Sequence, residues 1–158
     1  MAYWLFKTEP DELSIDDLKA EPSRSFLWDG VRNYQARNFL RDQVQLGDQV
    51  LIYHSSCKPP GIAGIARVSR TAYPDPSQFD ATSPYFDAKS TTDNPRWVAV
   101  DVQFEQKFDQ LLMLDMLKKY TKLANMPLVR KGNRLSVMPV TDDEWHAILS
   151  LKALSPQD

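Results

Sequence analysis

Residues 97–104 (WVAVDVQF) alternate between side chains that suit the buried face of a β-sheet and side chains that suit its less buried face. A period of two sends successive side chains to opposite faces of an extended chain, so this run predicts a β-strand. Residues 49–54 (QVLIYH) are rich in β-branched and aromatic side chains, which also favour strands. The chain is therefore expected to be organised around a sheet.

Further strands are predicted where short apolar runs stop at turn signals. The first is Tyr3–Lys7, which ends before Glu9-Pro10, and others are expected at 26–28, 61–70 and 135–140. Residues 61–70 (GIAGIARVSR) mix small and β-branched side chains, as in a strand that bends tightly. The glycines in this strand favour a small, barrel-like sheet over a flat one.

Helices are predicted between and after these strands. Ser14 begins a capping-box pattern for a short helix that Pro22 ends, and Asn33 suits the N-cap of a second helix, which runs to Asp42. Apolar residues at helical spacing predict a third helix over Leu111–Leu123. Thr141–Glu144 forms another capping box, which begins a last helix.

Residues 71–96 are rich in Pro, Asp, Ser and Thr and have little periodicity. We expect them to form a long ordered surface loop, a type of segment that is often functional. Strands with short helices between and after them indicate an α+β fold with a mixed, curled sheet. The 158 residues fit one domain of ordinary size, spanning 1–158.

Cys57 is the one cysteine of the chain, so no internal disulfide can form, which fits a reducing compartment. One cysteine with two distant histidines does not match a structural zinc site. No apolar run approaches the roughly 18–20 residues that cross a bilayer, and the N-terminus lacks a basic leader. We therefore expect a cytoplasmic protein with no membrane partner, metal or cofactor.

Charge is unevenly distributed along the chain. The net charge of −2 argues against a protein that coats nucleic acid by electrostatic attraction, since such proteins usually carry a basic surplus. Arg32, Arg37 and Arg41 nevertheless follow one another closely, and residues 130–134 hold a second basic group. A local basic face on an acidic protein would allow weak, selective binding.

Common catalytic signatures are absent. The sequence contains no Gly-x-Gly-x-x-Gly motif, no phosphate-cradling Gly-Lys-Ser/Thr loop and no Gly-x-Ser-x-Gly elbow. His54-Ser55-Ser56-Cys57 places an imidazole near hydroxyls and a thiol, which can form an activated nucleophile. A strand end that passes into a loop explains the same residues, and we assign no catalytic residue.

The stretch Trp28–Asn38 combines aromatic, amide, acidic and guanidinium side chains in a turn that leads into a helix N-terminus. An aromatic plane can stack on a base, while amides and a carboxylate can read the base edge. Free backbone amides at a helix N-terminus favour anions such as phosphate. The same residues also suit a Trp core anchor beside a capped helix, and spacing alone does not separate the two interpretations.

The sequence resembles the EVE domain family over nearly its whole length, from Tyr3 to about Leu149. The first motif has Thr8 where the family usually has Ser, so a hydroxyl is kept. The matching motifs are Lys7-Thr8-Glu9-Pro10, Trp28–Asn38, Tyr53-His54-Ser55, Pro60-Gly61-Ile62, Ala72–Pro76, Asp93–Trp97 and Arg130–Ser136.

The resemblance implies a PUA-like fold, in which a curled mixed sheet or pseudo-barrel is flanked by short helices. It also implies a non-catalytic module that takes a flipped, modified base of DNA or RNA, such as a modified cytosine, into an aromatic pocket. The residues expected at the base are Thr8, Glu9, Trp28, Asp29, Asn33, Tyr34, Gln35, Tyr53, His54, Ser55 and Trp97. Those expected at phosphate are Arg32, Arg37, Arg130, Lys131 and Arg134.

Two other functions stay open at this point. One is an enzyme that acts on a nucleobase, a nucleotide or RNA, like the hydrolases and RNases of the related ASCH group, with Lys7, Glu9, Tyr53 or His54 as acid or base. The other is a module that binds a peptide or small ligand in the same pocket. The oligomeric state, the base and the modification are not determined by the sequence.

Overall fold

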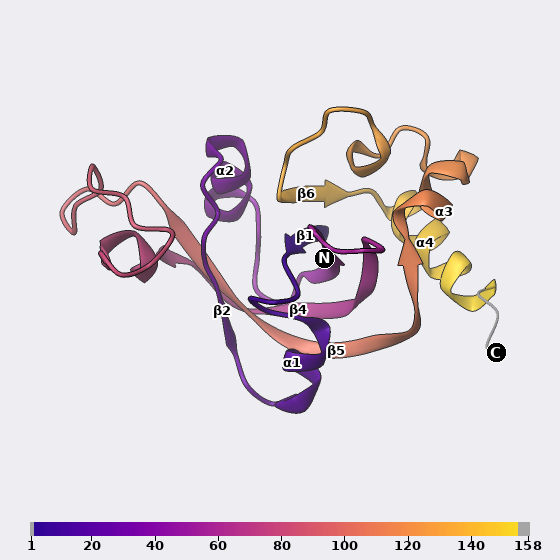
Figure 1. Ribbon diagram of the computed structural model, residues 1–158, viewed down its shortest axis with the longest axis horizontal. Helices are drawn as coiled ribbons and strands as arrows, with labels where there is room; N and C mark the ends of the chain where they lie inside the picture. The colour runs from indigo at the N-terminus through magenta and orange to yellow at the C-terminus, as the bar shows by residue number, and fades with distance from the viewer. Residues whose placement is uncertain (1, 155–158) are drawn as a thin grey trace.

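A six-stranded mixed sheet, with the order β2-β5-β4-β3-β1-β6, organises the computed structural model, which describes residues 2–154 (Figure 1). β1 and β3 run parallel to each other, and the other neighbouring strands are antiparallel. The strands are β1 (Tyr3–Thr8), β2 (Phe26–Trp28), β3 (Gln49–His54), β4 (Gly61–Pro74), β5 (Val98–Met113) and β6 (Val137–Val140).

Short helices connect and flank the strands. In Figure 1 the segment between β4 and β5 projects at one end of the molecule near α2, while α3 and α4 lie at the other end. The α-helices are α1 (Ile15–Ala20), α2 (Tyr34–Asp42), α3 (Leu114–Lys119) and α4 (Asp142–Leu154). Single 3₁₀ turns occur at η1 (Pro76–Phe79), η2 (Thr121–Leu123) and η3 (Pro127–Val129).

The sheet curls strongly but does not close. β1 and β2 are separated by three strands in the sheet order, yet the rings of Phe6 and Trp28 lie 5.4 Å apart. β4 pairs with β5 through several register shifts, and such bulges increase local twist. At Gly64 a Cβ atom would lie 2.3 Å from the carbonyl oxygen of Gln106, so only glycine allows this close approach. Within the described residues, β2 and β6 remain the two edges of the sheet.

Two apolar cores occupy the two faces of the curl. Inside it, Trp4, Phe6 and Trp28 pack with apolar residues of α1 and α2. On the outer face, strand residues pack against α3, α4 and the 3₁₀ turns, and Trp145 of α4 stacks on Tyr3 at 4.2 Å. The inner core therefore connects the end of β2 directly to β1.

The predicted α+β fold with a mixed, curled sheet is confirmed, as are the three caps. The side chains of Ser14, Asn33 and Thr141 accept hydrogen bonds from backbone N–H groups three residues later. The helix predicted over Leu111–Leu123 is wrong at its start, because β5 continues to Met113 and pairs with the first residues of β4. Long-range pairing overrides the helical spacing there.

The predicted loop at 71–96 also begins later than expected, because β4 extends to Pro74. Beyond it, η1 forms the first ordered turn of the segment that leads to β5.

Candidate functional site

A pocket of about 360 Å³ lies where the ends of several strands meet. Because β1 and β3 are parallel, their C-terminal ends share one edge of the sheet, and the curl brings the end of β2 to the same place. Backbone hydrogen bonds from Ser55 to Thr8 (2.9 Å) and from Lys7 to Ser136 (2.8 Å) join the segments at this edge. The lining residues are Lys7, Thr8, Glu9, Glu12, Leu13, Leu27, Trp28, Asp29, Gly30, Val31, Ser55, Tyr85 and Ser136.

Trp28 belongs to both the pocket and the core. Its side chain lines the cavity, but the residue is only 5% exposed and packs against Phe6. The core interpretation is confirmed, and a role of Trp28 in binding a base stays a prediction. Trp28 is a core anchor that also contributes to the pocket wall.

Tyr85 is a second aromatic wall, and it comes from the segment between β4 and β5. Its ring packs against Gly30, where a Cβ atom would lie within 2.9 Å of three ring atoms. Gly30 also has φ of +81°, so both the backbone and the packing require glycine. The hydroxyl of Tyr85 donates to Glu12 at 2.5 Å, and burial together with this bond raises the pKa of Tyr85.

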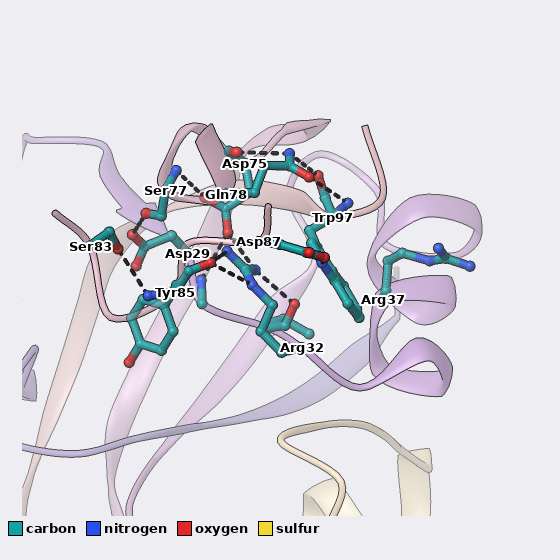
Figure 2. Close-up of polar contacts among 12 residues, drawn as sticks. Asp29, Arg32, Arg37, Asp75, Ser77, Gln78, Ser83, Tyr85, Asp87 and Trp97 are labelled. Atoms are coloured by element: carbon teal, nitrogen blue, oxygen red, sulfur yellow. Dashed lines mark hydrogen bonds and ion pairs between the residues drawn. The ribbon is translucent and has the colours of Figure 1, made fainter. Parts of the chain in front are cut away.

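Arg32 and Asp75 hold Tyr85 in place (Figure 2). The fully buried carboxylate of Asp75 accepts hydrogen bonds from the backbone N–H of Gly30 and from the Arg32 guanidinium, both at 2.9 Å. The same guanidinium donates twice to the carbonyl oxygen of Tyr85, at 3.1 and 2.8 Å. The Arg32 guanidinium therefore joins Asp75 to the backbone of Tyr85, and its donors are used by acceptors within the protein.

Gln78 fastens the two ends of the same segment. Its side-chain amide donates to the carbonyl oxygens of Asp75 and Trp97, each at 2.8 Å, and accepts from the Trp97 backbone N–H at 3.0 Å. The Ser90 hydroxyl donates to it as well, at 2.5 Å. Because a buried amide with all its partners is costly to move, residues 75–97 form a rigid support for Tyr85.

The pocket contains one cation among several acids. Burial lowers the pKa of Lys7, whose ammonium lies 5.8 Å from the centre of the Tyr53 ring. Within residues 2–154 this ammonium has no hydrogen-bond or ion-pair partner. Asp29 also lines the pocket, and its carboxylate accepts a hydrogen bond from the Ser77 hydroxyl. Over the same described residues, no cluster of His, Cys, Asp or Glu is arranged to hold a metal ion.

The structure brings together only part of the predicted base-binding set. The members that line the pocket are Thr8, Glu9, Trp28, Asp29 and Ser55. Those outside it are Asn33, Tyr34, Gln35, Tyr53, His54 and Trp97. A role in base binding for this second group stays a prediction, since these residues do not line the pocket.

Several of these outlying residues have other partners. Asn33 caps α2, and Tyr34 stacks on Trp97 at 4.8 Å. Tyr53 is buried in the outer core. His54 accepts a hydrogen bond from the backbone N–H of Ile15 at 3.1 Å.

Sequence reasoning did not name Tyr85, Ser136 or Lys7, which line the pocket, among the residues expected at the base. Tyr85 lies in a segment without periodicity, and its approach to Gly30 depends on contacts across 55 positions of the chain. From the sequence, Lys7 was considered only as the acid or base of a possible enzyme. The family motifs that contain Lys7 and Ser136 were the one available signal for these two residues.

The predicted phosphate-binding residues divide into two groups. The guanidinium of Arg32 is committed to Asp75 and Tyr85, and that of Arg37 donates to Asn38 and to the carbonyl oxygen of Arg96. The others are exposed, have no partner within the described part of the chain, and lie in the segment that leads to Ser136. They are Arg130, Lys131 and Arg134.

None of the helices within residues 2–154 is long and apolar enough to cross a membrane.

Comparison with known proteins gives consistent relatives. Human thymocyte nuclear protein 1 is 43% identical, with 98% of this chain and 76% of the human protein covered. The solved structure of the human protein in complex with DNA containing 5-methylcytosine superposes with a TM-score of 0.92, covering 99% of this chain and 100% of the other.

A bacterial structure is similar at the same level. A protein from Pseudomonas syringae is 54% identical and has a TM-score of 0.92, with 96% of this chain and 99% of that chain covered. The EVE domain model matches residues 2–151, nearly the whole sequence. The chain therefore belongs to the EVE domain family.

Proposed function

We propose that this protein binds DNA that carries a modified cytosine and reads the flipped base in the pocket beside Trp28 and Tyr85. The observation that carries the proposal is its close match to human thymocyte nuclear protein 1, which has been solved in complex with DNA containing 5-methylcytosine. The fold, the family and the pocket at the strand ends all agree with such a reader.

The pocket has the size and the walls that a single base needs. Its volume of about 360 Å³ lies within the range of roughly 300–1,000 Å³ that is usual for small-ligand sites. Stacking of a base on an aromatic side chain contributes roughly 1–3 kcal/mol, which offsets much of the few kcal/mol that extrusion from the duplex costs. Tyr85, which is more exposed than Trp28, is the better stacking surface.

Phosphate contacts are assigned to the basic loop at 130–134 rather than to the arginines of α2 and its approach. Arg130, Lys131 and Arg134 have no partner within the described residues, and Ser136 connects their loop to the pocket. Arg32 and Arg37 are already engaged by protein acceptors. The loop would position the DNA backbone, and the pocket would read the base.

Tyr85→Ala tests the aromatic pocket better than Trp28→Ala does. Removal of the buried Trp28 leaves a core cavity, a change that costs about 3–5 kcal/mol of stability. Tyr85 is only partly buried, and its backbone bonds to Arg32 remain in the variant. We expect Tyr85→Ala to fold normally and to lose about tenfold or more in affinity for 5-methylcytosine DNA, measured by fluorescence anisotropy.

Phe86→Ala is the matched control. Phe86 is a neighbouring aromatic residue, 43% exposed, that does not line the pocket. Its removal should leave affinity unchanged. Equal loss in both variants, or no loss in Tyr85→Ala, would contradict the pocket, and equal affinity of the native protein for modified and unmodified DNA would contradict the reader function.

The enzyme alternative has little support in the site. Of the residues proposed as acid or base, Lys7 and Glu9 line the pocket, whereas Tyr53 and His54 do not. Turnover of labelled oligonucleotides by the protein would support the enzyme alternative.

A cytoplasmic location also stays a proposal. It is supported by the single cysteine in the chain, and cell fractionation tests it.

A further inference from the structure

We propose that Lys7 and Asp29 form a donor–acceptor pair that reads the Watson–Crick edge of the flipped base and selects cytosine over thymine. This inference rests on the proposed function, because it assigns the chemistry by which the same pocket recognises its base. It adds Lys7 as a specificity-determining residue and gives Asp29 one defined role.

Lys7 is the one cation among the residues that line the pocket. Its ammonium carries three donors, is half-buried at the C-terminal end of β1, and has no acceptor within residues 2–154. Partial burial disfavours the charged ammonium, which lowers the pKa of Lys7. A ligand that brings an acceptor to this ammonium stabilises the charge, so Lys7 favours ligands with an acceptor at that position.

Asp29 is the acid best placed to act as the complementary acceptor. It follows Trp28 directly at the end of β2, and the Ser77 hydroxyl binds one of its oxygens. The other oxygen has no hydrogen bond within the described residues, so it can accept one from a ligand in the pocket that Asp29 lines. Glu9 and Glu12 are exposed, whereas Asp29 is partly buried.

Cytosine presents an amino donor beside a ring-nitrogen acceptor and a carbonyl acceptor. A carboxylate accepts from its amino group, and an ammonium donates to the neighbouring acceptors. Thymine presents a carbonyl and an N–H at the first two of these positions. The carboxylate would face a carbonyl oxygen, and the ammonium would face a donor. A pocket lined by one cation and by a carboxylate with a free oxygen therefore matches cytosine and disfavours thymine.

The experiment uses two ligands that differ only at this edge. 5-Methylcytosine and thymine carry the same methyl group, so each is placed opposite an abasic site in an otherwise identical duplex, which equalises the cost of flipping. Affinities are measured by anisotropy for the native protein, Lys7→Met, Lys7→Arg and Asp29→Asn. Thermal unfolding checks that each variant folds, and the near-isosteric Met should preserve the packing of β1.

We expect the native protein to prefer 5-methylcytosine by about tenfold or more. Lys7→Met and Asp29→Asn should each bring the ratio of the two affinities close to one, while Lys7→Arg retains part of it. Binding should weaken as the pH rises through the lowered pKa of Lys7, and Lys7→Met should lack this dependence.

Three results would overturn the inference. The first is equal affinity of the native protein for both duplexes. The second is an equal loss for both ligands in Lys7→Met, which would show that Lys7 contacts the DNA backbone. The third is an unchanged ratio in Asp29→Asn. In each case the reader function survives if Tyr85→Ala still loses binding to 5-methylcytosine DNA, and it fails separately if the native protein ignores the modification.

Discussion

At the scale of single residues, the site depends on groups whose partners are already fixed in the fold. Arg32 resembles a phosphate-binding arginine in the sequence, but its donors are directed at Asp75 and at the carbonyl oxygen of Tyr85. Lys7 resembles an ordinary strand-end lysine, yet its ammonium has no partner within the described part of the chain. The tertiary structure provides acceptors for the Arg32 guanidinium but, among residues 2–154, none for the Lys7 ammonium. Lys7 is therefore the cation that remains available to a ligand.

Gly30→Ala should damage the pocket, because a methyl group at this position meets the Tyr85 ring at 2.7 Å. Alanine at positive φ costs roughly 1–2 kcal/mol by itself, and displacement of Tyr85 adds to that. We expect a clear drop in the free energy of unfolding in urea together with a loss of binding to 5-methylcytosine DNA.

Gly132→Ala provides the comparison for Gly30→Ala. Gly132 has φ of +80°, but nothing lies within 4 Å of its Cβ position, so it shares the backbone strain without the collision. If the two substitutions destabilise the protein equally, the contact between Gly30 and Tyr85 is energetically unimportant.

At the scale of elements, strand ends and helix starts are joined by side-chain hydrogen bonds. The C-terminal end of β3 connects to the start of α1 through His54, whose Nε2 accepts from the backbone N–H of Ile15. Asp16 and Lys107 form an ion pair beside it. Since Glu12 and Leu13 precede α1 and line the pocket, this junction also helps to set one pocket wall.

Acid should destabilise the junction between β3 and α1. Burial lowers the pKa of His54 from its ordinary value of 6.5, with Lys107 acting in the same direction and Asp16 and Asp17 opposing it. Between 6.5 and the lower folded pKa, the unfolded chain binds a proton that the folded chain does not. This contribution to stability is therefore complete above about pH 6.5 and is lost as the pH falls through the folded pKa.

Urea unfolding of the native protein and of His54→Gln across this pH range measures the effect. Glutamine can still accept from Ile15 but does not titrate, so the variant should lose less stability on acidification. Parallel curves for the two proteins would exclude His54 as the titrating group.

At the scale of the whole molecule, an acidic protein with a net charge of −2 carries a basic loop near its pocket, and the charged side chains of this loop have no partner among residues 2–154. The pairing of β6 with β1 and the curl of the sheet place Ser136, which follows this loop, with the ends of β1 and β2 around one cavity. Electrostatic attraction to DNA should therefore be local, with few phosphates contacted. The salt dependence of binding should be correspondingly shallow.

Lys131→Ala should weaken binding to modified and unmodified DNA alike. Loss of one phosphate contact reduces the slope of log K against log salt concentration by about 1. Lys119→Ala, at an exposed lysine of α3 outside the basic loop and the pocket, should leave the slope unchanged. A salt slope unaffected by Lys131→Ala would remove the loop from the DNA-binding surface.

The sequence by itself determined those features whose physical causes are local. The caps at Ser14, Asn33 and Thr141 were predictable because each hydrogen bond spans only three residues. The strands of the sheet followed from periodicity, and the mixed curled fold followed from their order and from the resemblance to the EVE domain family. Trp28, at the centre of the predicted site, does line the pocket.

Only the tertiary structure decided which side chains meet. Tyr85 lies against Gly30 because the sheet curls and Gln78 holds the two ends of residues 75–97 together. Lys7 lies beside Ser136 because β1 pairs with β6. The extension of β5 to Met113 has the same origin, since pairing with β4 overrode a helical pattern. Such contacts join segments that are distant along the chain, and their free energies depend on the whole packed arrangement rather than on any local pattern of residues.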